Sequence, residues 1–224
     1  MILPAHTPLY RYDIQKPPSQ WSVDFHEYYY DCKGYKNMLG AFFFYDNKEN
    51  PIQTCRNDEK FEGICFLTQC ETVKEINLLD LRAERIMGML EILFENGINI
   101  LVPELNTFSQ CNALPLSGIA LDFEDYLSLK AINVKTNKDI INLSGLVQRI
   151  TRYIEPRKSN LSFRYFGQLL TDFENGPIFK QMLLKNGFDG YVFYEHDEGE
   201  PCVTTYCIFD NMCLSSPECQ QLRI

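Results

Sequence analysis

The chain has 224 residues, of which 45% are hydrophobic and 23% charged, and its formal net charge is −9. This composition predicts one globular domain over residues 1–224. Because nucleic-acid binding depends on clustered Lys and Arg, the acidic balance argues against a nucleic-acid partner. The longest apolar runs are shorter than the roughly 20 residues that a membrane span needs, so a membrane partner is not expected either.

The cysteines favour a reducing environment. Their number, nine, is odd, and the first residues after Met1 include Pro4 and Pro8 without an apolar signal core. We therefore expect a cytoplasmic protein, with delivery as an effector left open. Cys65 and Cys207 lie in apolar runs and are predicted to be free thiols in the core. A zinc site is not expected, because Cys-x-x-Cys is absent and the chain has three histidines.

Short apolar runs broken by polar turns dominate the N-terminal third and predict strands. These runs cover residues 9–12, 40–45, 63–67 and 73–81. Aromatic residues at helical spacing between Trp21 and Tyr30 predict a helix that covers one face of the sheet.

The middle of the chain changes to a helical period. Apolar residues from Ala83 to Phe94 fall on one helix face, with a stop at Asn96-Gly97, and those from Leu143 to Ile154 form another. No linker marks the edges of this region. We therefore expect a helical insertion across about residues 82–160, and not a second domain.

The C-terminal part predicts a helix, a strand, a loop and a second strand. The helix ends at Lys185-Asn186-Gly187, where Gly supplies the left-handed cap, and Pro177 suits its first turn. Strands are predicted at 190–194 and 203–209, on either side of a loop with three carboxylates.

Most common catalytic motifs are absent from the sequence: the phosphate-binding loop, the dinucleotide fingerprint, the Gly-x-Ser-x-Gly elbow and His-Glu-x-x-His. Five segments instead resemble the mono-ADP-ribosyltransferase superfamily: Leu9-Tyr10-Arg11, Gly40-Ala-Phe-Phe-Phe-Tyr-Asp46, Asn77-Leu-Leu-Asp-Leu81, Gly187-Phe-Asp-Gly-Tyr-Val-Phe-Tyr194 and Tyr206-Cys-Ile-Phe-Asp210. The resemblance implies an α+β fold with a split, mostly antiparallel sheet.

For function, the resemblance implies a toxin-like transferase with NAD as substrate, which transfers ADP-ribose to a protein acceptor or hydrolyses NAD. Arg11 and Tyr10 are the candidate nucleotide-binding residues, because a guanidinium matches phosphate geometry and stays charged. Phe44 or Tyr45 is the candidate nicotinamide wall. The alternatives are a surface ion pair for Arg11 and ordinary core packing for the aromatic residues.

The candidate catalytic carboxylates are Glu200 and Glu198, because an anion stabilises the oxocarbenium-like ribose of N-glycosidic cleavage. The sequence departs from the family where a Glu opens the closing strand: Thr205 stands there. Three alternatives follow: Glu200 reaches the site from the loop, the hydroxyl of Thr204 or Thr205 takes this role, or catalysis is lost. A catalytically silent member that binds a nucleotide or a protein partner is therefore the alternative function, and an unrelated interaction domain is a third.

Overall fold

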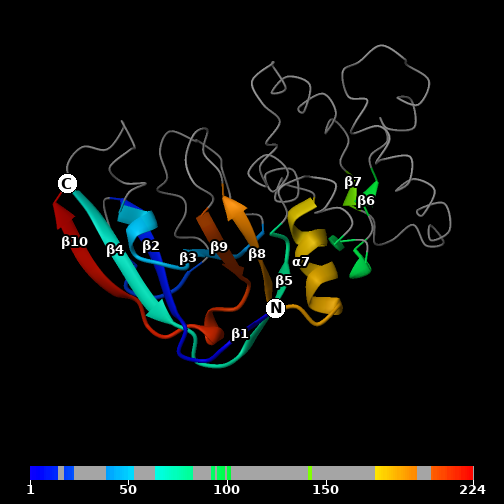
Figure 1. The fold of residues 1–224 in the computed structure, drawn as a ribbon, viewed down its shortest axis with the longest axis horizontal. Helices are drawn as coiled ribbons and strands as arrows, with labels where there is room; N and C mark the ends of the chain where they lie inside the picture. The colour runs from blue at the N-terminus through cyan, green and yellow to red at the C-terminus, as the bar shows by residue number, and fades with distance from the viewer. Residues whose placement is uncertain are drawn as a thin grey trace, which may run out of the picture.

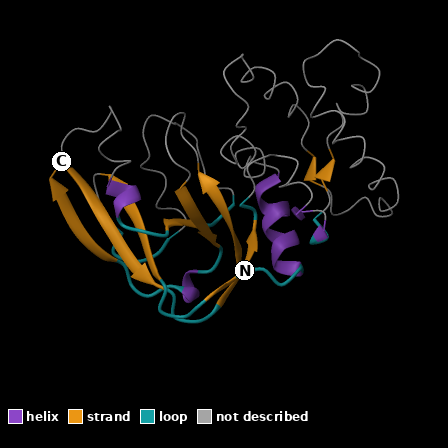
Figure 2. Ribbon diagram, in the orientation of Figure 1, coloured by secondary structure: helices purple, strands orange, loops and turns teal. Residues whose placement is uncertain are grey.

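A computed structural model describes residues 1–14, 18–22, 39–52, 64–82, 92–93, 95–98, 100–101, 141–142, 175–195 and 203–223. One eight-stranded, mostly antiparallel sheet dominates this part of the chain, with the helix α7 (Asn175–Lys185) and the short 3-10 helix η2 (Asn211–Cys213) (Figures 1 and 2). A large sheet with few helices agrees with the expected α+β class.

The eight strands are β1 (Ile2–Leu3), β2 (Pro8–Ile14), β3 (Phe42–Tyr45), β4 (Ile64–Glu71), β5 (Ile76–Asp80), β8 (Gly190–Glu195), β9 (Val203–Ile208) and β10 (Glu218–Arg223). Their order in the sheet is β1-β5-β8-β9-β3-β2-β4-β10, and only β5 and β8 run parallel. A separate parallel pair joins β6 (Ile100–Leu101) and β7 (Ile141–Asn142). The six strands predicted for the main sheet are confirmed. The sequence did not indicate β1 and β10, because β1 has two residues and β10 lacks an apolar alternation.

The sheet is weakest between β2 and β3. These strands share a single residue pair, Tyr10↔Tyr45, whereas β3 pairs with β9 along four residues. In Figure 1, β2, β4 and β10 lie to one side of β3, and β9, β8 and β5 lie to the other. The twist of the sheet lets side chains from both groups of strands meet on one side.

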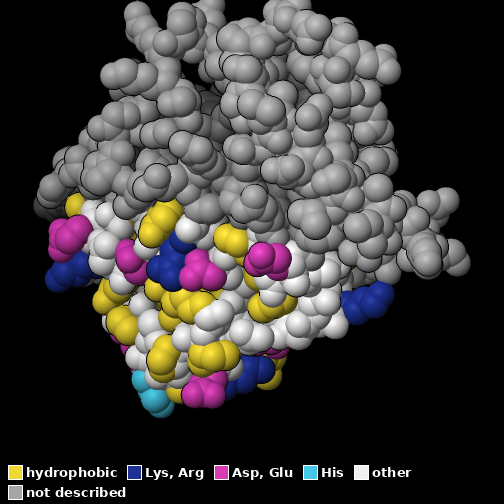
Figure 3. Space-filling model, turned by 45° about the vertical axis from the view of Figure 1, so that its right-hand side comes forward, with side chains coloured by type: hydrophobic (Ala, Val, Ile, Leu, Met, Phe, Trp, Pro, Cys, Tyr) yellow, Lys and Arg dark blue, Asp and Glu magenta, His cyan; other side chains and the backbone are white. Residues whose placement is uncertain are grey.

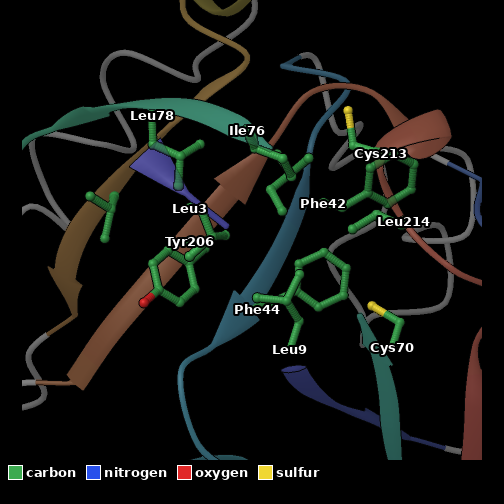
Figure 4. Close-up of a cluster of buried hydrophobic side chains, with 12 residues drawn as sticks. Leu3, Leu9, Phe42, Phe44, Cys70, Ile76, Leu78, Tyr206, Cys213 and Leu214 are labelled. Carbon is green, nitrogen blue, oxygen red and sulfur yellow. The ribbon is translucent and has the colours of Figure 1, made fainter. Parts of the chain in front are cut away.

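We call that side the inner face, and it holds the main hydrophobic cluster. The cluster combines Leu9 of β2 and Cys70 of β4 with Leu78, Val192 and Ile208 from the other strands. Figure 4 shows that its side chains converge from strands on both sides of the β2–β3 junction. Trp21 closes the cluster, with its ring 5.3 Å from Phe44 and its indole N–H donating to the carbonyl of Ser215 at 2.6 Å.

The opposite side of β8 and β9 packs against α7 and is called the α7 face. Phe179 of α7 contacts Tyr191 of β8, with their ring centroids 5.5 Å apart. Lys180 donates to the carbonyl of Gly40 at 2.6 Å, which ties the helix to the chain just before β3. The helix ends as predicted: Gly187 has φ of 81°, and the N–H of Phe188 donates to the carbonyl of Leu183 at 3.0 Å.

The segment Gly187-Phe-Asp-Gly190 joins three strands. The carboxylate of Asp189 accepts the backbone N–H of Asn77 at 2.9 Å, and its carbonyl accepts the N–H of Phe209 at 3.0 Å. Asp189 therefore fixes the start of β8 against β5 and β9. This local role accounts for a carboxylate between the two glycines without any catalytic function.

Several predictions for the helical regions fall outside the described residues. These are the helix after Trp21, the helix over 143–154 and most of the insertion at 82–160. The stop at Asn96-Gly97 is described and confirmed: Gly97 has φ of 76°, and the N–H of Ile98 donates to the carbonyl of Leu93 at 2.8 Å.

The cysteine prediction was right for one of its two residues. Cys207 is a free thiol, buried on the α7 face, as expected. Cys65 is instead disulfide-bonded. An apolar strand predicts burial, but it cannot show whether a second thiol lies within the short distance that a disulfide requires.

The free thiols should differ sharply in reactivity. Burial raises the pKa of Cys70 to about 12 and raises the pKa of Cys207 further still. Desolvation raises the pKa of Cys219 too, but Cys219 is exposed to the reagent, whereas the other three are buried. Since the thiolate is the reactive form, we expect iodoacetamide at pH 8 to modify Cys219 and to spare Cys70, Cys207 and Cys213 until the protein unfolds. Peptide mass mapping measures this order, and early labelling of Cys207 in the folded protein would contradict it.

Candidate functional site

Arg11 is a buried cation on the inner face. Strand alternation places Leu9, Arg11 and Asp13 of β2 on this side, and Arg11 is 6% exposed. Its Nη2 donates to Asp13 Oδ1 at 2.7 Å, and the hydroxyl of Thr68 donates to Asp13 Oδ2 at 2.5 Å. The Nε–H of Arg11 is buried and has no acceptor among the residues that the structure describes. Arg11 therefore keeps one hydrogen-bond donor that its ion pair with Asp13 does not use.

A row of side chains crosses the inner face next to Arg11. Asp80 of β5 pairs with Val192 of β8, and Val192 pairs with Tyr206 of β9. Tyr206 in turn pairs with Phe44 of β3. β2, which carries Arg11, is the next strand after β3. The row therefore places a carboxylate, a phenol and an aromatic ring on the same face as the buried guanidinium.

The next row is polar and forms the rim of this face. It contains Tyr194 of β8 and Thr204 of β9, which are register partners. Burial is the main cause that raises the pKa of Tyr206; the charge of Asp46 raises it further and that of Arg82 lowers it.

Asp80 and Arg82 make a bidentate ion pair at the end of β5. Arg82 Nε donates to Asp80 Oδ1 at 2.8 Å, and Nη2 donates to Oδ2 at 2.6 Å. This hydrogen bonding holds the pKa of Asp80 below its ordinary value despite partial burial. In Figure 3, acidic and basic side chains adjoin one another on the described surface, among hydrophobic ones. No group of three or more metal-ligating side chains occurs in the described ranges.

The two candidate carboxylates, Glu198 and Glu200, lie outside the described residues. The loop that carries them joins β8 to β9, and its ends are held together by the pair Glu195↔Val203. This pair directly follows the pair Tyr194↔Thr204 of the polar rim. The loop therefore leaves the sheet beside Tyr194 and Thr204.

The structure divides the other predicted site residues between the two faces. Phe44 shares the inner face with Arg11, but it is 1% exposed and packs against Trp21. Tyr10 and Tyr45 are partners on the α7 side of the sheet. Thr205, paired with Tyr45, is buried on that side too. Arg11 and Phe44 are thus brought to one face, whereas Tyr10, Tyr45 and Thr205 point to the other.

Sequence analysis missed four polar residues of the inner face: Asp13, Thr68, Arg82 and Tyr206. Period-two alternation from Arg11 predicts Asp13 on the same face, so that signal was present. Thr68 required the register between β2 and β4, which sequence patterns do not give.

Comparisons with known proteins add no family. No protein-family model, no curated protein and no solved structure matches the chain. Within the described ranges, no helix has both the length and the apolar character to cross a membrane.

Proposed function

We propose that this protein binds NAD and breaks the bond between nicotinamide and ribose, with transfer of ADP-ribose to a protein acceptor or to water. The observation that carries the proposal is the buried Arg11, whose Nε–H has no acceptor among the described residues. A guanidinium with an unused Nε–H suits a pyrophosphate, because charge-assisted hydrogen bonds to phosphate oxygens are strong and geometrically selective.

The proposed reaction needs a leaving group, a cation stabiliser and a nucleophile. The electron pair of the glycosidic bond departs with nicotinamide, which becomes neutral, and the ribose gains oxocarbenium character. Glu200, or Glu198 from the same loop, is proposed to stabilise that cation. The acceptor then bonds to the ribose carbon and releases a proton.

The NAD-binding residues predicted from the sequence need one correction. Arg11 and Phe44 lie on the inner face, so Tyr10 and Tyr45 cannot contact a ligand that Arg11 holds there. Tyr206, in register with Phe44, takes the place of Tyr45 as the second aromatic residue of the proposed site.

A catalytically silent nucleotide-binding protein is the second candidate. The observation that favours it is Thr205: it stands where the family that the sequence resembles has a Glu, and its side chain lies on the face opposite to Arg11. This orientation leaves catalysis dependent on the loop between β8 and β9.

Nicotinamide release and NAD binding together test the proposal. Purified protein should bind NAD in isothermal titration calorimetry and release nicotinamide in a chromatographic assay. Arg11→Ala serves as the control, because loss of the anchor should weaken NAD binding. Binding without turnover would favour the silent protein, and neither binding nor turnover would reject both readings.

A further inference from the structure

Among the described residues there are two Arg–Asp ion pairs, each between residues two apart in sequence, and they differ in one hydrogen bond. Arg82 uses Nε and Nη2 to hold both oxygens of Asp80, at 2.8 and 2.6 Å. Arg11 uses Nη2 alone, at 2.7 Å from Asp13 Oδ1. The same edge of the Arg11 guanidinium therefore keeps a buried Nε–H without an acceptor among the described residues.

Thr68 accounts for the difference. It lies opposite Arg11 in the β2–β4 register and is fully buried. Its hydroxyl donates to Asp13 Oδ2 at 2.5 Å, and this hydrogen bond holds Oδ2 toward Thr68, while Arg11 Nε makes no hydrogen bond to it. No described side chain other than Arg82 donates to Asp80: Oδ1 accepts Nε and the backbone N–H of Arg82, and Oδ2 accepts Nη2.

An unpaired buried donor lowers stability, so its presence calls for a functional explanation. We propose that Thr68 and Asp13 are positioning residues that keep the Nε–H of Arg11 open for an oxygen of a phosphate or pyrophosphate ligand. Asp13 fixes the guanidinium through Nη2, and Thr68 orients the Asp13 carboxylate so that Oδ2 does not pair with Nε. The inference rests on the proposed NAD-binding role of Arg11. It adds the two residues that position the Arg11 guanidinium for the ligand.

The test removes the hydroxyl without changing the shape of the side chain. Thr68→Val is close in size to threonine but cannot donate, and Thr68→Ser keeps the hydroxyl as the matched control. We expect Thr68→Val to weaken binding of inorganic pyrophosphate and of NAD roughly 10-fold or more, the effect of one charge-assisted hydrogen bond. Thr68→Ser should bind like the wild type. Calorimetry gives the affinities, and thermal unfolding shows that both variants are folded.

Two further readouts separate positioning from a purely structural role. If the protein turns over NAD, Thr68→Val should raise KM and leave kcat nearly unchanged, because a phosphate contact acts in the ground state and the transition state alike. In the wild-type protein, the ¹⁵N resonance of Arg11 Nε should shift on addition of pyrophosphate. This measurement decides the matter even where Thr68→Val fails to fold.

The outcomes distinguish this inference from the proposed function. Wild-type affinity in Thr68→Val, equal weakening in Thr68→Ser, or an unchanged Arg11 Nε resonance with saturating pyrophosphate would each overturn the positioning role. NAD turnover that Thr68→Val leaves untouched would overturn it while the enzyme proposal stands. Pyrophosphate binding that depends on Thr68, in a protein that does not bind NAD, would support the inference and reject the NAD proposal.

Discussion

Gly190→Ala should strongly destabilise the sheet, and more than Gly187→Ala, although each substitution adds one methyl group. A Cβ at position 190 would lie 2.0 Å from the carbonyl oxygen of Cys207 and 3.0 Å from Leu78 Cδ2. The blocking atom belongs to the backbone of β9, so β8 and β9 would have to separate. Overpacking usually costs 1–3 kcal/mol, and we expect about 3 kcal/mol or more here. For a chain of this length, that loss lowers Tm by roughly 6–12 °C.

Gly187→Ala is the matched control in the same segment. Gly187 has φ of 81°, but nothing lies within 4 Å of an added Cβ, so only backbone strain opposes the substitution. That strain costs about 1–2 kcal/mol. Urea or thermal unfolding of both variants measures the difference. The register of β8 between β5 and β9 would be wrong if Gly190→Ala were as stable as the wild type, or were less damaging than Gly187→Ala.

Glu200→Gln should abolish most NAD turnover while it leaves NAD binding largely intact. The carboxylate is proposed to interact chiefly with the developing ribosyl cation, and glutamine keeps the size of the side chain without its charge. Loss of one such group typically lowers the rate on the order of 100-fold to 1,000-fold. Arg11→Ala should instead weaken NAD binding, because a phosphate anchor acts before the chemical step.

Glu198→Gln is the control, since it removes an equivalent charge from the same loop. Nicotinamide release under saturating NAD measures turnover, and calorimetry measures affinity. If Glu198→Gln is the inactive variant, the catalytic carboxylate is Glu198. If both variants stay fully active, the assignment of a loop carboxylate is wrong and Thr204 is the next residue to substitute. Thr204 is preferred to Thr205 because it shares the inner face with Tyr206, two residues further along β9.

The sequence was sufficient for features that depend on neighbouring residues. Runs of β-branched and aromatic residues located six of the eight strands, and Gly187 located the end of α7, because a left-handed cap is a local requirement. Alternation along β2 also places Asp13 on the same face as Arg11. The sequence did not indicate β10, whose polar residues become a strand only because β4 offers an edge to pair with.

Only the tertiary structure decided which candidates share a face. Strand register puts Tyr10, Tyr45 and Thr205 on the side opposite to Arg11, and a shift of one residue would have reversed this. Register also brings Thr68 opposite Arg11, across a separation in sequence that no local pattern spans. The disulfide at Cys65 likewise depends on the tertiary structure and follows from no local sequence pattern. The type of each element follows from local propensity. The composition of a site depends instead on pairing between segments distant in sequence, because that pairing decides which polar side chains are buried and which hydrogen bonds they make.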